Sequence, residues 1–331
     1  MATPLLVRKT LVLAKVETAE GVDPIPTGAN NALLVSAATP TVNSEQIERS
    51  IFIAHLSRLG TIQGITTGQL AFTTELRGIS DIPTAVAPLR EDPLFRACGM
   101  SPTYATSSAF YQPISTGMES CTLYTYLDGA LFVMLGCRGN FEITAETGQY
   151  GAINWTMQGM LVTLTSGNFT TGFMRDATVA SASAAYQAFS VKPPPVFGVA
   201  LSLDGDSTTF VCQSFTMNMN NEIQQRLDMT EGGGVKSFML TGRNPQGTLN
   251  PEAVTRTDYD FWYKWQAAGE SILDLTIGTL TENKVRIYAP AVQYGVPAWG
   301  ERNGMRTFEM PLSFNADTDA GNDELKIMYV T

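Results

Sequence analysis

Few residues of the types that perform acid–base or metal chemistry stand at the spacing that such chemistry needs. The chain has a single histidine, His55, which lies in an apolar run without a second histidine at HxxxH or HExxH spacing. No GxSxG segment is present, so the nucleophile of a serine hydrolase of that type is not visible. We expect His55 to be structural or to lie in a surface loop. We expect no catalytic residue, no bound cofactor and no metal ion.

Two segments match ligand-binding loops only in part. Residues 232–237 read Gly-Gly-Gly-Val-Lys-Ser, but a phosphate loop needs the glycine, lysine and serine to be adjacent, and Val235 separates them. Residues 317–323 carry Asp and Asn at spacings similar to those of a calcium loop, but a strand replaces the acidic ligand expected after Gly321. We predict turns in both places and keep a weak ion site at the second as an alternative. Paired carboxylates of a glycosidase also stay possible, because such partners meet only in space.

Composition limits the function classes. The 331 residues suffice for one large domain or two smaller ones, and only 16% are charged, against about 25% in an average soluble domain. The net charge of -10 argues against stable binding to a phosphate backbone. No apolar run approaches the roughly 20 residues of a membrane span, and the apolar start is too short for a secretory signal. We therefore expect a soluble protein made in a cytoplasm.

The four cysteines have neither CxxC nor zinc-site spacing. In a cytoplasm they would remain thiols, and free cysteine is among the most buried residue types. We predict that they are small core residues. They are Cys98, Cys121, Cys137 and Cys212.

Alternation of apolar and polar residues is the commonest pattern and predicts strands with one buried face. The predicted buried positions are Ile153, Trp155 and Met157; Leu273, Leu275 and Ile277; Val285 and Ile287; Phe308, Met310, Leu312 and Phe314; and Leu325, Ile327 and Tyr329.

Helical spacing occurs in two short segments that both end at glycine. Residues 92–99 place Pro93 in the first turn and Gly99 at the stop, which predicts a short helix. Residues 258–269 place Phe261, Trp265 and Ala268 on one stripe. We interpret this aromatic stripe as core plus an interface and not as a site that stacks bases or sugars.

These similar ends are part of an internal repeat. Residues 95–99 match residues 265–269, Phe72 matches Phe238, and later strands match at separations of 150 and 155 residues in the same order. We predict two tandem β modules, each with a short flanking helix; one large β-sandwich is the alternative. The predicted organisation is an N-terminal arm, a first module, a Pro-rich linker or outer loop and a second module, with the boundaries 1–29, 30–165, 166–197 and 198–331.

Several segments together resemble the tail tube proteins of long-tailed bacteriophages. The resemblance covers most of the chain, although residues 101–118 and 170–188 match no known segment. The segments that carry it are LAKVETAEGVDPIPTGANNALLV near the start, Glu48-Arg49-Ser50, residues 93–100, residues 120–129, residues 136–139, RNGMRTFEMPLSF and GNDELKI.

The resemblance implies modules of β-sandwich or half-barrel form whose inner sheets join to line a hollow tube of stacked rings. It implies contacts between subunits and rings through an N-terminal arm, residues 7–14, and through long loops at residues 51–66 and 226–235. Six modules around the bore would need three copies of a two-module chain, a homotrimer with pseudo-sixfold symmetry. The candidate contact residues are Val7, Leu11, Leu13, Ile51, Phe52, Ile53, Leu56, Arg58, Arg226 and Leu227.

An acidic lumen suits this role, because it repels DNA phosphates and lets the genome slide through. The lumen candidates are acids on polar strand faces: Glu142, Glu146, Asp274 and Glu309. The family further implies a structural virion protein without enzymatic activity, made in the host bacterium. It implies contacts with the tape-measure protein, the tail terminator and distal tail proteins, and none with a membrane. A head decoration protein, a tail terminator or a carbohydrate-binding or carbohydrate-processing β protein stays an alternative.

Overall fold

Alternating apolar and polar residues fold most of the chain into strands. The computed structural model describes residues 5–54, 57–79, 84, 88–105, 108–164, 171–177, 192–204, 206–207, 211–279 and 283–330. The first half contains η1 (Val7–Lys9), β1 (Thr10–Val16), α1 (Gly28–Asn31), β2 (Ala32–Leu33), β3 (Val35–Ile47), β4 (Ile62–Glu75), α2 (Asp92–Ala97), β5 (Met100–Tyr104), β6 (Ser108–Pro113), β7 (Cys121–Leu127), β8 (Ala130–Glu146), β9 (Ala152–Met160) and β10 (Met174–Asp176). The second half contains β11 (Ala200–Leu203), β12 (Asp206–Ser207), β13 (Cys212–Asn218), β14 (Asn221–Leu227), β15 (Val235–Arg243), β16 (Gln246–Pro251), α4 (Phe261–Gln266), β17 (Glu270–Ile277), β18 (Lys284–Tyr294), β19 (Ala298–Arg302), β20 (Met305–Phe314) and β21 (Lys326–Val330). The protein is mainly β, as the sequence predicts.

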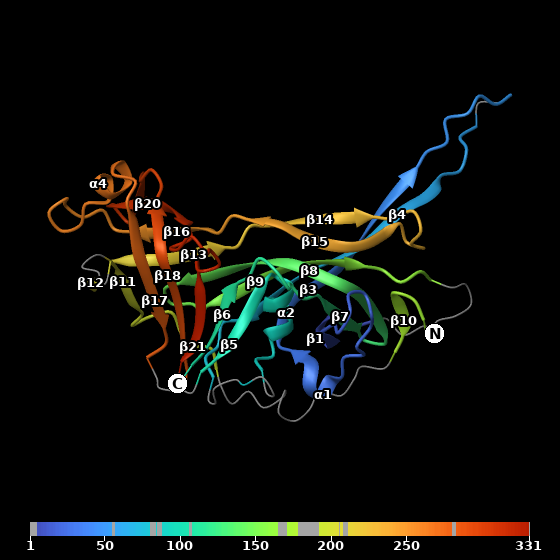
Figure 1. Ribbon diagram of the computed structural model, residues 1–331, viewed down its shortest axis with the longest axis horizontal. Helices are drawn as coiled ribbons and strands as arrows, with labels where there is room; N and C mark the ends of the chain where they lie inside the picture. Colours follow the sequence, from blue (N-terminus) through green and yellow to red (C-terminus); the bar gives the residue numbers. More distant parts are fainter. Residues whose placement is uncertain are drawn as a thin grey trace.

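One antiparallel sheet runs through both halves of the chain, and we call it the long sheet. Its strand order is β3-β4-β9-β8-β13-β16-β20-β19. The two halves meet where β8 pairs with β13 over five residues, from Glu142↔Asn218 to Glu146↔Ser214. The hairpin β14–β15 forms a separate two-stranded sheet. In Figure 1 this hairpin crosses the first half of the chain, while the β3–β4 hairpin extends beyond the body of the molecule.

Two further sheets pack against the long sheet. Their strand orders are β2-β1-β7-β8-β10 and β12-β11-β17-β18-β21-β6-β5. Both β8 and β18 pass from these sheets into pairing with the long sheet. The segment at 101–118, for which the sequence predicts nothing specific, contains most of the β5–β6 hairpin, and β6 pairs with the C-terminal strand β21.

Helix α2 packs into the centre of the core through Phe95. The ring of Phe95 stacks on Tyr111 at 4.6 Å and meets Phe141 and Trp155 edge-on. Pro93 occupies the first turn, and Gly99 follows the helix with a φ of 77°, a backbone angle that glycine adopts without strain. The first predicted helix is therefore confirmed.

The alternating segments are strands whose apolar side chains are buried, as predicted. Three of the cysteines, Cys98, Cys121 and Cys137, are buried thiols, and Cys212 is half-buried. Burial raises the pKa of Cys98 and of Cys137 well above the ordinary thiol value. Residues 7–14 differ from the predicted arm, and residues 258–269 differ in part from the predicted aromatic stripe.

The predicted arm at residues 7–14 is largely a strand of the protein's own sheet. Thr10 to Val16 pair along their whole length with β7, and Leu11 and Leu13 are buried with Ala32 and Val133 in a second apolar cluster. Leu11 and Leu13 therefore face the core of their own chain, and their prediction as subunit contacts is wrong.

The predicted stripe of α4 is only partly buried. Phe261 is buried against Tyr294 and Phe308, whereas Trp265 is 37% exposed. The helix begins at Phe261, after the side chain of Asp260 accepts a hydrogen bond from the Tyr263 backbone N–H. The sequence match of Trp265 with Phe95 therefore does not extend to burial, because Phe95 is fully buried.

We expect Phe261→Ala to lower the free energy of unfolding by about 3–5 kcal/mol, because it leaves a cavity in the core. Trp265→Ala should lower it by less than half as much, since that ring is already partly in water. Urea unfolding of the unassembled protein, followed by circular dichroism, measures both. Equal losses in the two variants would contradict this assignment of the core.

Candidate interaction surfaces

The face of the long sheet that points away from the core carries hydroxyl and amide side chains that join neighbouring strands. Asn140 Nδ2 donates to Asn218 Oδ1 at 2.7 Å, across the junction between β8 and β13. The hydroxyls of Thr216 and Thr248 lie 2.7 Å apart between β13 and β16. Such cross-strand pairs stabilise a sheet without apolar burial. The result is a broad surface that is polar but largely uncharged, and we call it the polar face.

Three of the four predicted lumen acids lie on the polar face. Glu142 and Glu146 alternate on β8 with buried Ile143 and Ala145, and Glu309 alternates with buried neighbours on β20. The amide of Asn154 donates to Glu142 at 3.5 Å. The structure therefore brings these three acids to one surface, spread over strands from both halves of the chain.

Asp274 lies outside the long sheet. It belongs to β17, which pairs with β11 and β18, and β18 in turn pairs with β20 at Val292 to Tyr294. Its carboxylate accepts hydrogen bonds from Nε and Nη2 of Arg286, at 2.8 and 2.5 Å. Alternation predicts the strand face of Asp274 but not which strands lie beside it, and its place in a lumen stays a prediction.

An arginine lies at the β19 end of the long sheet. Nη2 of Arg302 lies 2.9 Å from the carboxylate of Glu252. Nη1 donates to the side-chain oxygens of Gln213 at 2.8 Å and Asn250 at 3.2 Å. The guanidinium is therefore matched by acceptors of this chain.

Both outer strands of the long sheet have one free edge within the part of the chain that the structure describes. There β3 pairs only with β4, and β19 pairs only with β20. An unpaired edge presents backbone N–H and C=O groups that can pair with another chain. Between these edges, the junction of β8 with β13 shows how the two halves join.

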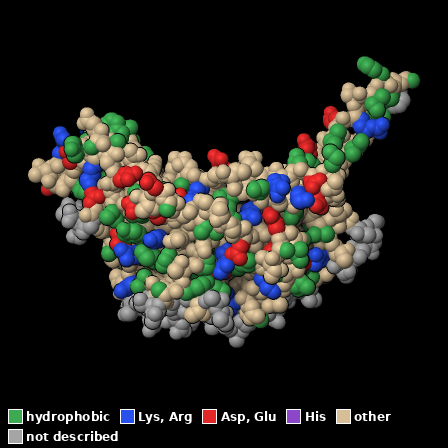
Figure 2. Space-filling model, in the orientation of Figure 1, with side chains coloured by type: hydrophobic (Ala, Val, Ile, Leu, Met, Phe, Trp, Pro, Cys, Tyr) green, Lys and Arg blue, Asp and Glu red, His purple; other side chains and the backbone are tan. Residues whose placement is uncertain are grey.

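The two long hairpins differ in their surroundings. In β14–β15, Val235 and Phe238 are buried, and the side chain of Asn221 donates to the backbone carbonyls of Cys98 and Gly139 in the first half of the chain. The outer part of β3–β4 extends away from the protein (Figure 1) and exposes apolar side chains, drawn green in Figure 2. These exposed residues are Val42, Ile47, Ile51, Phe52, Ile53 and Ile62.

Most of the other predicted contact residues are also exposed at hairpin ends. Arg58 forms an ion pair with Glu48 at 2.5 Å in the first hairpin. Arg226 and Leu227 are exposed at the end of β14. Leu56, like His55, lies outside the described residues. Val7 is 90% exposed and lies apart from the hairpins, in the η1 turn before β1.

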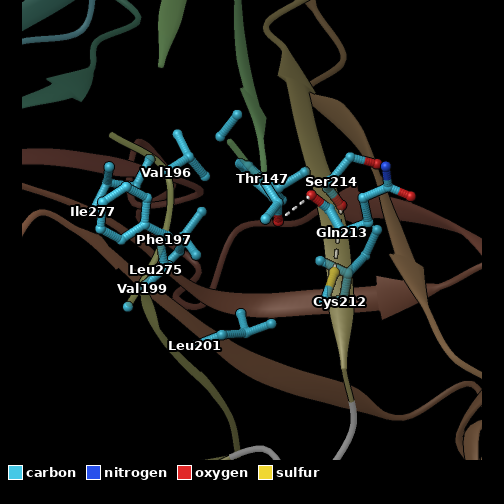
Figure 3. Close-up of a pocket in the computed structure, with 14 residues that line it drawn as sticks. Thr147, Val196, Phe197, Val199, Leu201, Cys212, Gln213, Ser214, Leu275 and Ile277 are labelled. Carbon is cyan, nitrogen blue, oxygen red and sulfur yellow. Dashed lines mark hydrogen bonds between the residues drawn. The ribbon is translucent and has the colours of Figure 1, made fainter. Parts of the chain in front are cut away.

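Figure 3 shows a pocket beside the junction of the two halves. Val196 and Phe197 approach it from the segment before β11, Leu275 and Ile277 from β17, and Cys212 from the start of β13. The close-up also shows Thr147, whose hydroxyl donates to the backbone carbonyl of Gln213 at 2.9 Å. Apolar side chains with a few hydroxyl and amide groups line the pocket.

The remaining site predictions concern metals and membranes. Among the residues that the structure describes, no group of three or more His, Cys, Asp or Glu side chains could hold a metal ion. The carboxylate of Asp323 accepts hydrogen bonds from the backbone N–H groups of Asp317 and Thr318, as in a turn. Within the described ranges, no helix has the length and apolar character to span a bilayer.

Sequence reasoning missed two features of these surfaces. It assigned residues 195–197 to a linker or outer loop, although Val196 is buried against the turn after β8. It also missed Trp299, which is 57% exposed on the free edge strand β19. The three prolines at 193–195 favour an extended linker and hide the first feature.

The chain was compared with known proteins. The profile of one family, described as phage tail tube protein, matches residues 8–319. A search of curated proteins finds no match.

We expect the paired substitution Ile47→Lys and Ile62→Lys to leave the unfolding midpoint of the single chain nearly unchanged, because the two residues face each other across the hairpin and are more than half exposed. The same variant should weaken self-association at least about tenfold, since burying the two charges is costly. Light scattering across a concentration series measures association. The matched variant Ile47→Val with Ile62→Val should associate like the natural chain; equal association of the lysine variant would show that this surface makes no contact.

Proposed function

The chain belongs to the phage tail tube protein family, and we propose that three copies close into a ring of six similar units whose stacked rings form the tube. Family membership makes the protein a structural component of the virion, a tail tube subunit that associates with itself and with other tail proteins. The ring of three, its contacts and the lining of its bore are our proposal. The observation that carries it is the repetition of one strand register in the two halves of the long sheet.

The pairs of the first hairpin recur 177 residues later (216 − 39). Thr39↔Ala71 in β3–β4 corresponds to Thr216↔Thr248 in β13–β16. Farther out, Ser44↔Thr66 corresponds to Asn221↔Arg243 in β14–β15. The single long hairpin of the first half therefore corresponds to two shorter hairpins in the second. A constant separation over both supports an origin by tandem duplication.

Irregularities in the ladders recur as well. The bulge between Ser44 and Gln46 corresponds to the one between Glu222 and Ile223. The bulge between Cys121 and Leu123 corresponds, 150 residues later (271 − 121), to the one between Ser271 and Leu273. Bulges are specific features of a ladder, so their coincidence supports equivalence better than alternation alone does.

The register also refines the pairs that the sequence suggests. Phe72↔Trp155 corresponds to Leu249↔Met310, at separations of 177 (249 − 72) and 155 (310 − 155) residues. Leu249, and not Phe238, is then the counterpart of Phe72. By its burial, Phe261 is the counterpart of Phe95.

The internal junction supplies a template for the contact between copies. Ile143↔Ile153 in β8–β9 corresponds to Trp299↔Phe308 in β19–β20, so β19 is the counterpart of this part of β8. Since β3 is the counterpart of β13, the free β19 edge of one copy would pair with the free β3 edge of the next. The observed pair Met217↔Ile143 then corresponds to Pro40↔Trp299 between copies.

The side chains on the two edges differ in size in a compensating way. At the internal junction, Ile143 of β8 pairs with Met217 of β13. At the proposed junction, the larger, exposed Trp299 would pair with the smaller Pro40. Close packing favours pairing a large side chain with small ones. This exchange supports a specific contact at which the Trp299 indole becomes covered.

Joining the edges would place the polar face toward the bore. That face carries Glu142, Glu146 and Glu309 among hydroxyls and amides, and Arg302 at its end is matched by Glu252. Phosphates would be repelled weakly and find few cationic partners, so DNA could pass without binding. The exposed apolar side of the β3–β4 hairpin would contact the next ring.

Electron microscopy of the assembled protein, with the symmetry taken from class averages, tests the proposal. Stacked rings with three chains around a central hole are expected. Six chains per ring would keep the tube and refute the two-unit ring. Single rings that never stack would favour a terminator-like role, and a monomer at every concentration and in the presence of tail initiation proteins would refute self-assembly.

We expect Glu142→Lys with Glu146→Lys to slow genome ejection severalfold in virions that carry the variant, because the reversed charges attract phosphates. Raising the salt concentration should remove much of this delay, since phosphate binding depends on counterion release. The matched variant Glu142→Gln with Glu146→Gln, which removes the two charges without reversing them, should slow ejection less. Unchanged ejection in the double variant would show that β8 does not line the bore.

A further inference from the structure

The segment just before β11 holds the two halves of the chain together. Gly148 N–H donates to the carbonyl of Val196 at 3.2 Å, and Val196 N–H donates to the carbonyl of Gln149 at 2.8 Å. Pro195 and Tyr150 form an antiparallel bridge beside them. The Val196 side chain is only 6% exposed and lines the pocket of Figure 3. Residues 195 and 196 thus pair with the turn between β8 and β9.

The repeat register gives this segment a counterpart at the start of the chain. Leu11 pairs with Tyr126 in β1–β7, and Ala200 pairs with Thr276 in β11–β17. Tyr126 and Thr276 are counterparts at the separation of 150 found for β7 and β17, so Leu11 corresponds to Ala200, a separation of 189 residues (200 − 11). Extended upstream, this makes Val7 the counterpart of Val196 and Leu6 that of Pro195.

Val7 and its counterpart differ sharply in exposure. Val7 is 90% exposed, whereas Val196 is buried; Leu6 is 52% exposed, and its counterpart Pro195 is exposed as well. The N-terminal segment is nevertheless held in place, because Leu6 N–H donates to Asp128 Oδ2 at 2.9 Å and Lys9 lies 3.1 Å from the same carboxylate. These contacts lower the pKa of Asp128, so the anchor persists at neutral pH. An anchored apolar segment therefore projects into solvent.

The turn that would receive this segment is exposed too. The turn between β8 and β9 corresponds to the Asn303–Gly304 turn between β19 and β20, and Tyr150 corresponds to Met305 (305 − 150 = 155). Asn303 and Gly304 have φ angles of 51° and 82°, as in a tight hairpin turn. Met305 is 47% exposed, and its counterpart Tyr150 is 48% exposed beside Pro195. In Figure 1, β20 lies at the left end of the molecule and β1 in its right half, so the described N-terminal residues lie away from the turn of their own chain.

We propose that Leu6 and Val7 of one copy bind the β19–β20 turn of the neighbouring copy in the ring, with Leu6 beside Met305. The contact reproduces between copies the bond that residues 195 and 196 make within the chain. It rests on the proposed three-copy ring and adds to it a second connection beside the joined β3 and β19 edges. The occupant is a second copy of this chain, because the internal contact supplies both the register and the matching apolar residues.

Cysteine cross-linking tests this contact in assembled tubes. The variant Leu6→Cys with Met305→Cys should form disulfides under mild oxidation, because bridged strand partners bring Cα atoms within disulfide reach. Each copy has one donor and one acceptor position, so a closed ring gives covalent dimers and trimers and nothing larger. Each single variant, which keeps the natural cysteines, is the control and should stay monomeric on a non-reducing gel.

The other outcomes contradict the proposal in distinguishable ways. Tubes with three chains per ring but no cross-links would refute this contact and leave the ring intact. A ladder beyond the trimer would show that the segment joins successive rings. An oxidised species confined to the monomer would show a contact within one chain. Rings of six chains, or no rings, would instead refute the function on which the contact rests.

A second variant tests the contact without new cysteines. Val7→Asp should raise the protein concentration needed for tube growth at least about tenfold. The proposed contact would bury position 7 as Val196 is buried within the chain, and burying a carboxylate there is costly. Val7→Ile, which keeps an apolar side chain, should assemble like the natural chain. The unfolding midpoint of the single chain should be the same in all three, since Val7 is exposed there. Unchanged assembly of Val7→Asp would overturn the contact.

Discussion

The fold depends on a change of sheet within β8. Its first half pairs with β7 and β10, its second half with β9 and β13, and the register shifts between Leu135 and Arg138. At this point Gly136 has a φ of 59°, and a Cβ there would lie 2.6 Å from the Met160 side chain. The left-handed backbone angle favours glycine here, whereas the flexible end of Met160 could shift to admit a Cβ.

A buried carboxylate holds this change of sheet in place. Glu17 accepts hydrogen bonds from the Gly136 backbone N–H at 2.7 Å and from the hydroxyls of Ser120 and Thr122 at 2.6 and 2.7 Å. The backbone N–H of Gly21 is a fourth donor. Buried polar groups at an irregular strand need such partners. Glu17 fixes where β8 leaves the sheet that it shares with β7 and β1. It thereby also fixes where β8 meets β13, and so how the two halves of the chain join.

The sequence predicts those strands that have one face in the core and the other face exposed to solvent. Phe308 to Phe314 and Ile153 to Met157 alternate because each strand separates core from solvent. In β1, Leu11 to Ala14 are all buried, so the sequence does not alternate and does not predict a strand there. The segment is therefore predicted to be an arm. Asp274 shows a related limit of alternation: the pattern predicts its strand face, but the strands that lie beside β17 depend on long-range pairing. The free β19 edge and the role of Val196 also arise only from tertiary pairing.

A two-unit chain changes the energetics of ring closure. In the proposed ring, three of the six junctions lie within a chain and form on folding. Translational and rotational entropy is therefore lost on association at only the three junctions between chains. The junctions within a chain need not have the same side chains as the junctions between chains. The two kinds can therefore diverge, as the pair Ile143 with Met217 differs from the proposed pair Trp299 with Pro40. This divergence favours correct pairing of edges, because a β19 edge shaped for small partners accommodates β3 better than a second β13-like edge. Duplication thus reduces the number of association steps and gives the remaining edges a distinct shape, which a ring of identical single units cannot do.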